Sequence, residues 1–265
     1  MDGPLEEWSE WMRAAGASDK TIETRLKGIS ALCSNAGIDD PVSLTTRQIV
    51  RWLAGCNSAW TRSTYATSVR LWHKWLVDQE LRADDPTERV PRPPQPRGVP
   101  RPAATSVLGA VLPTAPRRAR AYILLCAFEG LRVSEVARVR GEDFDGEGWL
   151  YVNGKGSVSA ALPVHQLVEQ LRVGFPVEGW WFPSNGGHVT PEAVSATISR
   201  TFQRAGYRVR AHELRHWFGT HALRNSRDLR VVQDLMRHAS PSSTAIYTQV
   251  ASRRKQEAVW GLKYR

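Results

Sequence analysis

Cysteine is scarce in this chain of 265 residues, and long apolar runs are missing. The three cysteines, Cys33, Cys56 and Cys126, lack the spacing of metal ligands, which argues against a disulfide framework or a zinc site. No stretch approaches the roughly eighteen apolar residues of a membrane span, and the acidic start at residues 1–10 is unlike a signal peptide. The sequence therefore predicts a cytoplasmic protein with buried thiols and no membrane contact.

Acidic residues are also few relative to basic ones. The chain holds 26 Asp and Glu against 36 Lys and Arg, which gives a net charge of +10. The excess lies mainly after residue 102, where 22 basic residues stand against 13 acidic ones, whereas residues 1–90 hold 11 against 13. A basic excess concentrated in one part of a chain indicates a polyanionic partner, and we expect nucleic acid.

Proline gathers at a single place. Residues 91–102 contain six prolines with Arg92, Arg97 and Arg101 between them, which predicts an extended linker. At about 3.1 Å per residue such a linker spans on the order of 35 Å, enough to carry the chain across a DNA duplex. The sequence therefore predicts two domains, one on each side of residues 91–102.

Residues 1–90 show helical patterns and no strand signal. We expect helices at residues 5–15, 18–36, 45–54 and 61–81. Six of the eleven tryptophans lie in this part of the chain, and we expect most of them to form the core of a small helical bundle: Trp8, Trp11, Trp52, Trp60, Trp72 and Trp75.

The part after the linker is predicted to be mainly helical with one small β-hairpin. The expected helices are residues 116–129, one opened by Ser134, and residues 165–172, 190–204, 212–224 and 228–237. Residues 149–152 and 158–164 alternate like strands around Asn153-Gly154-Lys155-Gly156, a tight-turn signal that places Lys155 at the hairpin tip.

The segment from His212 to Tyr247 holds residues suited to breaking a phosphodiester. On a helix, His212 and Arg215 share a face and can reach one phosphate together. The next helix ends at His238, and Tyr247 follows nine residues later, after a turn-forming run at residues 240–243. This spacing predicts a site that binds and attacks a phosphate group.

A zinc peptidase is the competing interpretation, because residues 212–216 read His-Glu-Leu-Arg-His and satisfy the pattern H-E-x-x-H. Its third metal ligand falls at Ala222, while His221 arrives one position early and points about 100° away. Arg215 also lies between the two presumed ligands of a dication. These mismatches disfavour the peptidase.

Two further motifs indicate a resemblance to a known protein family. Gly130-Leu131-Arg132-Val133-Ser134-Glu135 follows an apolar run, and Lys155 lies further along the chain. With six positions filled in order (Arg132, Lys155, His212, Arg215, His238 and Tyr247), the chain resembles the tyrosine recombinase, or phage integrase, family. The resemblance covers residues 103–250 strongly and residues 1–90 more loosely.

The resemblance implies a two-domain, C-shaped clamp around DNA, mainly α with a small β-sheet. Residues 1–90 correspond to a helical core-binding domain, residues 103–250 to the catalytic domain, and residues 251–265 to a C-terminal tail. The family's activity is site-specific recombination of double-stranded DNA. Since the chain begins almost at the core-binding domain, it is expected to be an integrase without an arm-binding domain.

The resemblance also assigns the nucleophile and the proton carriers. Tyr247 is expected to join the 3′-phosphate and to release a 5′-hydroxyl, so that the bond energy is kept for religation. His212 is expected to accept or relay the tyrosine proton, and Lys155 to protonate the departing 5′ oxygen. No cofactor, metal ion or ATP is expected.

The phosphate itself is assigned to three cationic or donor groups. Arg132 and Arg215 are expected to hold the pentacoordinate phosphorane, with His238 as a further donor. Glu135 is expected to orient Arg132. His216 and His221 are expected to face away from His212 and to serve a structural role.

The sequence departs from the family pattern before His238, where the usual glycine is Arg237. This change predicts a different turn or an added phosphate contact. The tail contains Val259, Trp260, Leu262 and Tyr264. We expect it to pack on a neighbouring protomer, with docking on its own domain as the alternative.

The expected partners are double-stranded DNA attachment sites, further copies of the chain (a dimer on each site and a tetramer in synapsis) and a directionality factor. The residues expected to contact DNA outside the catalytic site are basic or histidine side chains: Lys20, Arg25, Lys27, Arg62, Arg70, His73, Lys74, Arg92, Arg97 and Arg101. The open alternatives are a chromosome-dimer resolvase, a type IB topoisomerase and a catalytically silent DNA-binding regulator.

Overall fold

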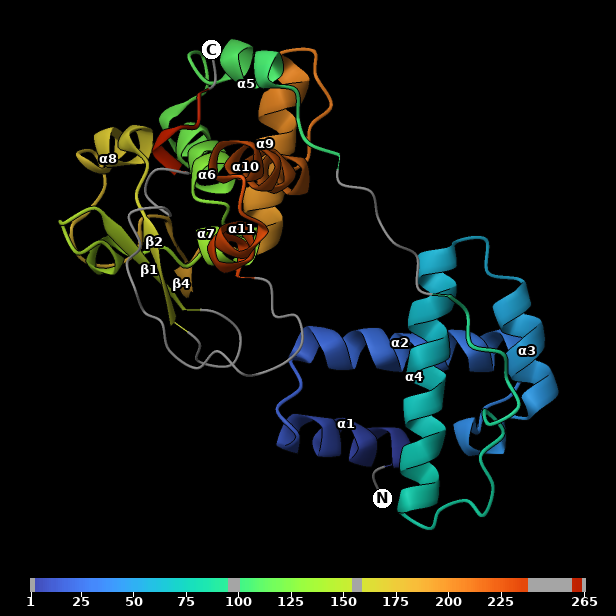
Figure 1. Cartoon of the computed structure of the whole chain (residues 1–265). Helices are drawn as coiled ribbons and strands as arrows, with labels where there is room; N and C mark the ends of the chain where they lie inside the picture. Colours follow the sequence, from blue (N-terminus) through green and yellow to red (C-terminus); the bar gives the residue numbers. More distant parts are fainter. Residues whose placement is uncertain (1–2, 95–100, 154–158, 238–258, 264–265) are drawn as a thin grey trace. The chain divides into compact units, whose positions relative to one another are not determined.

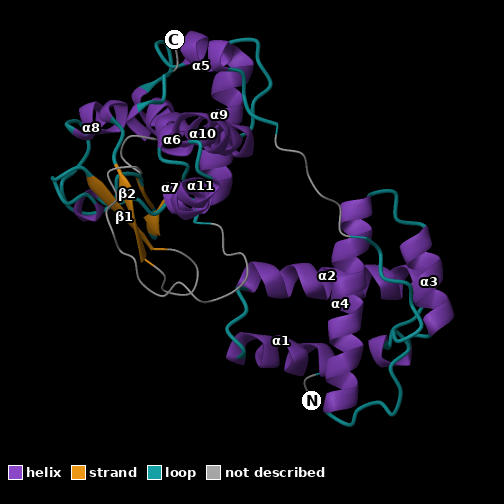
Figure 2. Ribbon diagram, viewed as in Figure 1, coloured by secondary structure: helices purple, strands orange, loops and turns teal. Residues whose placement is uncertain are grey.

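The computed structural model describes residues 3–94, 101–153, 159–237 and 259–263. It divides into two compact units, Met1–Gly98 (unit 1) and Val99–Arg265 (unit 2). Figures 1 and 2 show helices throughout both units. Among the described residues, short antiparallel strands occur in unit 2 only. The predicted mainly helical fold with a small β component is confirmed, while the C-shaped clamp stays a prediction.

The helices of unit 1 begin where the sequence supplies a capping side chain. Ser18, Thr45 and Ser58 each accept a hydrogen bond from a backbone N–H of the first turn, and Thr45 with Gln48 completes a capping box. The described elements of this unit are α1 (Pro4–Ala14), α2 (Asp19–Ala36), the 3-10 helix η1 (Pro41–Ser43), α3 (Thr46–Ala54) and α4 (Ala59–Asp78). Because Ser58 is the cap, the last helix begins two residues earlier than predicted.

Tryptophan forms much of the core of unit 1. Trp8 and Trp72 are completely buried, with ring centroids 5.2 Å apart, and Trp75 stacks on Trp72 at 5.4 Å. Trp52 is also buried, and these four side chains confirm the prediction that most of the six tryptophans are core residues. The two exceptions, Trp11 and Trp60, are half exposed.

Unit 2 is built around α6, a helix whose second half is buried on every side. Its residues 121–128 are all buried, and α8, α9 and α10 pack against it. The described elements of this unit are α5 (Thr105–Val111), α6 (Arg117–Phe128), α7 (Val133–Val136), η2 (Gly141–Asp143), β1 (Trp149–Asn153), β2 (Ser159–Pro163), α8 (Gln166–Arg172), β3 (Pro183–Ser184), β4 (Gly187–His188), α9 (Pro191–Arg204), α10 (Ala211–Ser226) and α11 (Leu229–Met236).

The two strands of the predicted hairpin are confirmed. β1 and β2 pair antiparallel, from Trp149 opposite Pro163 to Asn153 opposite Ser159. Leu150 and Val152 are buried while Tyr151 is 47% exposed, which is the alternation expected of a half-buried strand. Lys155 lies in the connection, outside the described residues.

Three predictions for unit 2 need correction. The sequence analysis missed α5, a seven-residue helix without a capping side chain that depends on burial of Leu108 and Val111. It also missed β3 and β4, although the intervening Asn185-Gly186 is a turn signal and Gly186 has φ +88°. Finally, α7 begins at Val133, so Ser134 lies inside it rather than opening it.

The described end of the chain completes the core of its own unit. Val259 and Leu262 are buried there, and the Trp260 indole donates to the Val164 carbonyl at 3.1 Å. The Nδ1 of His165 accepts from Leu167 N, so its Nε2 carries the proton and donates to the Leu262 carbonyl at 3.1 Å. For residues 259–262 the structure therefore shows docking on the same unit, while packing of the tail on a neighbouring protomer stays a prediction.

Glu129, at the end of α6, is a buried carboxyl that makes the stability of unit 2 depend on pH. It is 1% exposed; its Oε1 accepts from His165 N at 2.8 Å, and its Oε2 has no hydrogen-bond partner among the described residues. Burial raises the pKa of Glu129 to about 8, against the lowering effect of the His165 hydrogen bond and the Arg237 charge. The folded unit therefore holds this proton more tightly than the unfolded chain does.

We expect the free energy of unfolding of unit 2 to fall by roughly 4 kcal/mol through this group as pH rises from the ordinary carboxyl pKa to about 8. Glu129→Gln, which keeps the acceptor oxygen but cannot ionise, should remove this part of the slope. Urea unfolding between pH 5 and 9, followed by hydrogen exchange of unit 2 amides, measures it. The exposed Glu178→Gln is the control, and an equal slope in both variants contradicts the prediction.

No helix among the described residues is both long and apolar enough to span a bilayer.

Candidate active site

The site begins at the turn after α6, which only glycine can make. Gly130 has φ +62°, and a Cβ at this position would clash with the ring of Phe218 on α10. This close approach packs the turn after α6 against α10. It also directs the Gly130 carbonyl toward Arg215, whose Nη1 donates to it.

Arg132 and Glu135 are joined at the start of α7. The Arg132 Nη1 donates to Glu135 Oε1 at 2.8 Å, and the Arg132 backbone N–H donates to Glu135 Oε2 at 2.7 Å. The Arg132 side chain is 42% exposed, whereas that of Glu135 is 8% exposed. Glu135 therefore fixes the Arg132 side chain and leaves part of its guanidinium exposed. The pairing agrees with the expectation that Glu135 orients Arg132.

Arg215 lies on α10 with its side chain 4% exposed. Its guanidinium donates to the carbonyls of Gly130 and Met236, and its Nη1 lies 4.0 Å from Glu135 Oε2. Burial, assisted by the charges of Arg132 and Arg237, lowers the pKa of Arg215 to about 9, so the group stays charged at neutral pH. This arginine fastens α10 to the ends of both α6 and α11.

Arg237 also lies at this site, although its contact with Glu135 was not predicted from the sequence. It ends α11 in the left-handed region, with φ 49° and ψ 46°. Its Nη2 donates to Glu135 Oε2 at 2.7 Å and to the Gly130 carbonyl at 3.2 Å, while its own carbonyl accepts from Arg132 Nη2 at 3.2 Å. This is the left-handed conformation that glycine favours, and the Arg237 side chain points to Glu135 and is 8% exposed.

These four residues, Arg132, Glu135, Arg215 and Arg237, are called the arginine cluster below. Burial alone would raise the pKa of Glu135, but the Arg237 charge and the hydrogen bonds from Arg132 and Arg237 keep it below its ordinary value. Glu135 is therefore a carboxylate, and the cluster carries three positive charges against one negative. Its exposed edge, Arg132, suits an anion with several oxygen acceptors, such as a phosphate.

His212 lies on the first turn of α10, one turn before Arg215, and is exposed. Its ring lies against that of His216, with centroids 4.1 Å apart, so the prediction that His216 faces away is wrong. Residues four apart on a helix share a face, which explains the contact. His221 does face elsewhere: it stacks on Trp217 and bonds to Thr105 Oγ1 at 3.2 Å.

Three predicted catalytic residues, Lys155, His238 and Tyr247, lie outside the described residues. Two of them nevertheless have described neighbours in the sequence. β1 and β2 begin and end the connection that holds Lys155, and His238 directly follows Arg237 of the arginine cluster. The cluster thus brings together Arg132, Glu135 and Arg215, with His212 on the same helix as Arg215.

In the described part of the chain, no group of three or more His, Cys, Asp or Glu is placed to hold a metal ion. Ala222, which occupies the third ligand position of the peptidase pattern, is completely buried. The two histidines of that pattern are the neighbouring rings of His212 and His216.

The predicted DNA-contacting residues fall into different surroundings. His73 is completely buried, with Nδ1 2.8 Å from the Val69 carbonyl, so it is corrected to a core residue. Arg62 and Arg70 donate to backbone carbonyls of their own unit. Lys20 and Lys27 pair with Glu23. The exposed remainder is Lys74, Arg92 and Arg101, while Arg25 is partly buried and Arg97 lies outside the described residues.

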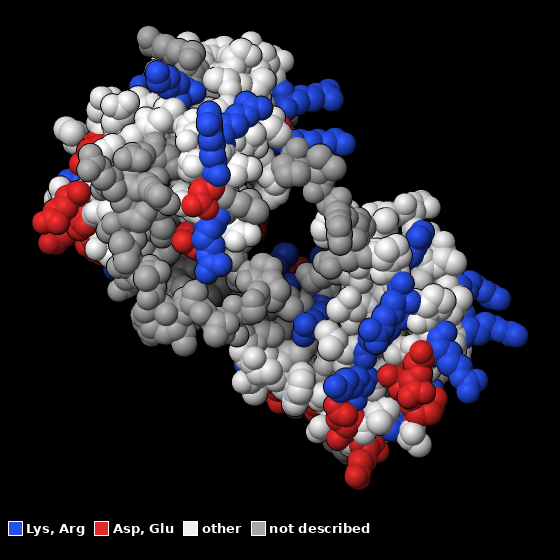
Figure 3. All heavy atoms as spheres, viewed as in Figure 1, with Lys and Arg blue, Asp and Glu red and all other residues white. Residues whose placement is uncertain are grey.

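Figure 3 shows Lys and Arg side chains projecting from both units, with acidic groups beside many of them. The basic residues therefore do not form an uninterrupted patch on the face drawn.

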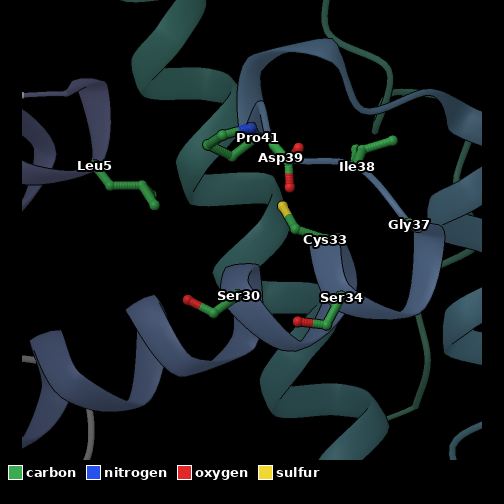
Figure 4. Close-up of a pocket in the computed structure, with 8 residues that line it drawn as sticks. All are labelled: Leu5, Ser30, Cys33, Ser34, Gly37, Ile38, Asp39 and Pro41. Atoms are coloured by element: carbon green, nitrogen blue, oxygen red, sulfur yellow. The ribbon is translucent and has the colours of Figure 1, made fainter.

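A pocket of about 500 Å³ lies in unit 1 and is drawn in Figure 4. Its lining includes Cys33, Asp39, Ser30 and Ser34, from α2 and the loop after it. Burial, followed by the charge of Asp40, raises the pKa of the Cys33 thiol, which makes it a poor nucleophile. The arginine cluster of unit 2 is therefore the better candidate for chemistry.

A helical unit that presents guanidinium groups held by a buried carboxylate, in a chain with a basic excess, suits a protein that binds the phosphates of a nucleic acid. The family model described as "Phage integrase family" matches residues 105–254, which is more than half of the chain. The chain therefore belongs to the phage integrase family. Members of this family are tyrosine recombinases, and this chain is a site-specific DNA recombinase, an enzyme that breaks and rejoins DNA.

Individual relatives agree with this membership. Tyrosine recombinase XerC of Erythrobacter litoralis (strain HTCC2594) is 32% identical over 227 residues, which are 76% of this chain and 74% of the relative. The structure of an integrase from mycobacterium phage Brujita is 41% identical, with a TM-score of 0.59, covering 98% of this chain and 92% of that one. A lambda integrase (75–356) dimer bound to a COC′ core site has a TM-score of 0.73 at 16% identity, covering 93% and 98%, and shows the fold alone.

Proposed function

We propose that the chain is an integrase that cleaves double-stranded DNA with Tyr247 and rejoins it to a second duplex. The Tyr247 Oη attacks the scissile phosphorus, the bond from phosphorus to the 5′ oxygen breaks, and a 3′-phosphotyrosyl ester and a 5′-hydroxyl result. The tyrosine proton passes to His212, and Lys155 supplies a proton to the departing 5′ oxygen. The number of phosphoester bonds is unchanged, so a 5′-hydroxyl of another duplex can reverse the step without ATP.

The arginine cluster is the observation that carries the proposal. A phosphodiester under attack gains a second negative charge on its non-bridging oxygens, and fixed cationic donors stabilise that charge. Arg132 offers an accessible guanidinium fixed by Glu135, and Arg215 lies 4.0 Å from the same carboxylate. We assign both to the phosphate, with His238 as a further donor.

Each of the two units has its own role in the proposed reaction. We propose that unit 1 is a core-binding domain on DNA and that unit 2 is the catalytic domain, connected by the proline-rich segment at residues 91–102. Dimers on each site, a tetramer in synapsis and a directionality factor complete this proposal. Support for self-association comes from solved relatives, among them a lambda integrase tetramer bound to a Holliday junction.

An integrase is favoured over a chromosome-dimer resolvase by one comparison. The phage Brujita integrase is 41% identical over nearly the whole chain, whereas the Xer recombinases reach about 30%. The resolvase remains the second candidate because two Xer relatives also cover 96% of the chain.

Nicked suicide duplexes test the proposed function. Footprinting on the DNA of the host and of its mobile elements first locates the bound site, and a duplex with a nick beside the scissile phosphate then traps the cleaved strand. The expected result is a covalent complex whose labelled peptide contains Tyr247, together with joining of two different duplexes. Relaxation of supercoils without joining of duplexes indicates a topoisomerase, and binding without any covalent complex indicates a regulator.

A further inference from the structure

Arg237 occupies a backbone position that ordinarily favours glycine. It caps α11 with φ 49°, in the left-handed region where a side chain is sterically disfavoured. Arg227 caps α10 in the same way, with φ 51°, but its side chain is exposed. The Arg237 side chain is instead 8% exposed and turned into the arginine cluster. This difference shows that a helix end alone does not account for the contacts of Arg237.

The contacts of Arg237 connect it to both phosphate-binding arginines. Its Nη2 donates to the Glu135 oxygen that also accepts from the Arg132 backbone, and the other Glu135 oxygen accepts from the Arg132 guanidinium. The same Nη2 shares the Gly130 carbonyl with Arg215. The Arg237 carbonyl also accepts from Arg132 Nη2, so by fixing Glu135 and by this direct contact Arg237 limits the positions that the Arg132 guanidinium can take.

The net charge of the arginine cluster gives a second reason to assign Arg237 a role at the scissile phosphate. Arg132 and Arg215 alone would face the Glu135 carboxylate with a net charge of one, whereas with Arg237 the net charge is two. The nearby Glu129 carboxyl does not offset this charge at neutral pH, because burial keeps it protonated. Two positive charges match the two negative charges that a phosphodiester carries when tyrosinate attacks it.

We propose that Arg237 is a positioning residue for DNA cleavage, which fixes and neutralises Glu135 so that Arg132 and Arg215 keep their full charge for the scissile phosphate. This proposal rests on the proposed function, since it concerns the same phosphate. Arg237 itself acts through Glu135 and Arg132 rather than by touching the DNA.

Arg237→Gly, Arg237→Lys and the matched control Arg227→Gly test this role in the full chain. Both glycine variants replace arginine at a left-handed helix end, but only one of them removes a contact to Glu135. The assay measures the rate of covalent-complex formation on a suicide duplex, and the Kd for the same DNA. A second duplex carries a methylphosphonate at the scissile position, which has one negative charge fewer.

We expect Arg237→Gly to slow cleavage on the order of 10- to 100-fold with little change in Kd, and Arg237→Lys to recover part of the rate. Arg227→Gly should cleave like the unaltered chain. On the methylphosphonate duplex the defect of Arg237→Gly should shrink to a few-fold, because the transition state then carries a single negative charge.

Two results overturn the proposal alone: a rate for Arg237→Gly equal to that of the unaltered chain, or the same fold loss on both duplexes, which marks a purely structural role. Thermal unfolding of each variant detects misfolding, and the ratio of the two rates within one variant is independent of how much of it is folded. An unaltered chain that forms no covalent complex on the phosphate duplex overturns the proposed function as well.

Discussion

Tyr247→Phe is expected to lower the rate of covalent-complex formation by at least about 10⁴-fold, to the limit of detection. The phenol oxygen is the atom that we propose to become esterified to DNA, and phenylalanine has no atom that can replace it. DNA binding should be unchanged within about twofold, because the loss of one hydroxyl removes no charge at neutral pH. A gel that separates covalently bound from free labelled strand measures the rate.

Tyr207→Phe provides the control for this experiment. Tyr207 is a partly exposed tyrosine of unit 2, just after α9, and we assign it no part in catalysis. Its variant should form the complex at the ordinary rate. If the Tyr247 variant still becomes attached to DNA, another side chain is the nucleophile, and the assignment of the whole segment from His212 onward is wrong.

Arg215→Lys is expected to reduce cleavage by about 10³-fold, the second largest effect. Lysine keeps the positive charge but replaces a planar fork of donors by a compact ammonium group, whose geometry does not match the hydrogen bonds to the carbonyls of Gly130 and Met236 and to a phosphate. The buried Met236 carbonyl then loses its donor from Arg215, while the Gly130 carbonyl keeps that from Arg237, so a loss of thermal stability should accompany the loss of rate.

Folding and chemistry are separated for Arg215 by a control on the same helix. Arg224→Lys changes an exposed arginine in the last turn of α10 and should leave both cleavage and the melting temperature unchanged. For Arg215→Lys, the measurement is repeated below the melting temperature, at a protein concentration that saturates the DNA. Cleavage at the ordinary rate under those conditions would refute a role for Arg215 at the phosphate.

The helix boundaries that the sequence predicted best are those with a local cause. Ser18 and Asp228 lie beside the backbone N–H groups that they cap, so their effect is independent of the rest of the fold. α5 has no such signal: its N-cap is Ala104, and the burial of Leu108 against the rest of unit 2 stabilises it. Its existence depends on contacts that are distant in sequence.

Contacts in the candidate site were likewise predicted where they are local in sequence and missed where they are distant. The pairing of Arg132 with Glu135 follows from their spacing of three residues, so the sequence predicted it. Arg237 could not be assigned to Glu135 because 102 positions separate them, and their contact depends on how α7 and the end of α11 pack within unit 2. His73 was mistaken for a surface residue because α4 is buried on more sides than its polar residues suggest.

The shared carboxylate of Glu135 has a consequence for the history of this sequence. Loss of Glu135 alone would leave Arg237 buried without its ion-pair partner, whereas loss of Arg237 alone would leave Glu135 paired with Arg132. Loss of Arg237 is therefore the easier first step, and position 135 is expected to change only in descendants that have already lost Arg237. Aligned descendants that keep Arg237 should then keep an acidic residue at position 135, a correlation that genome sequences alone can reveal.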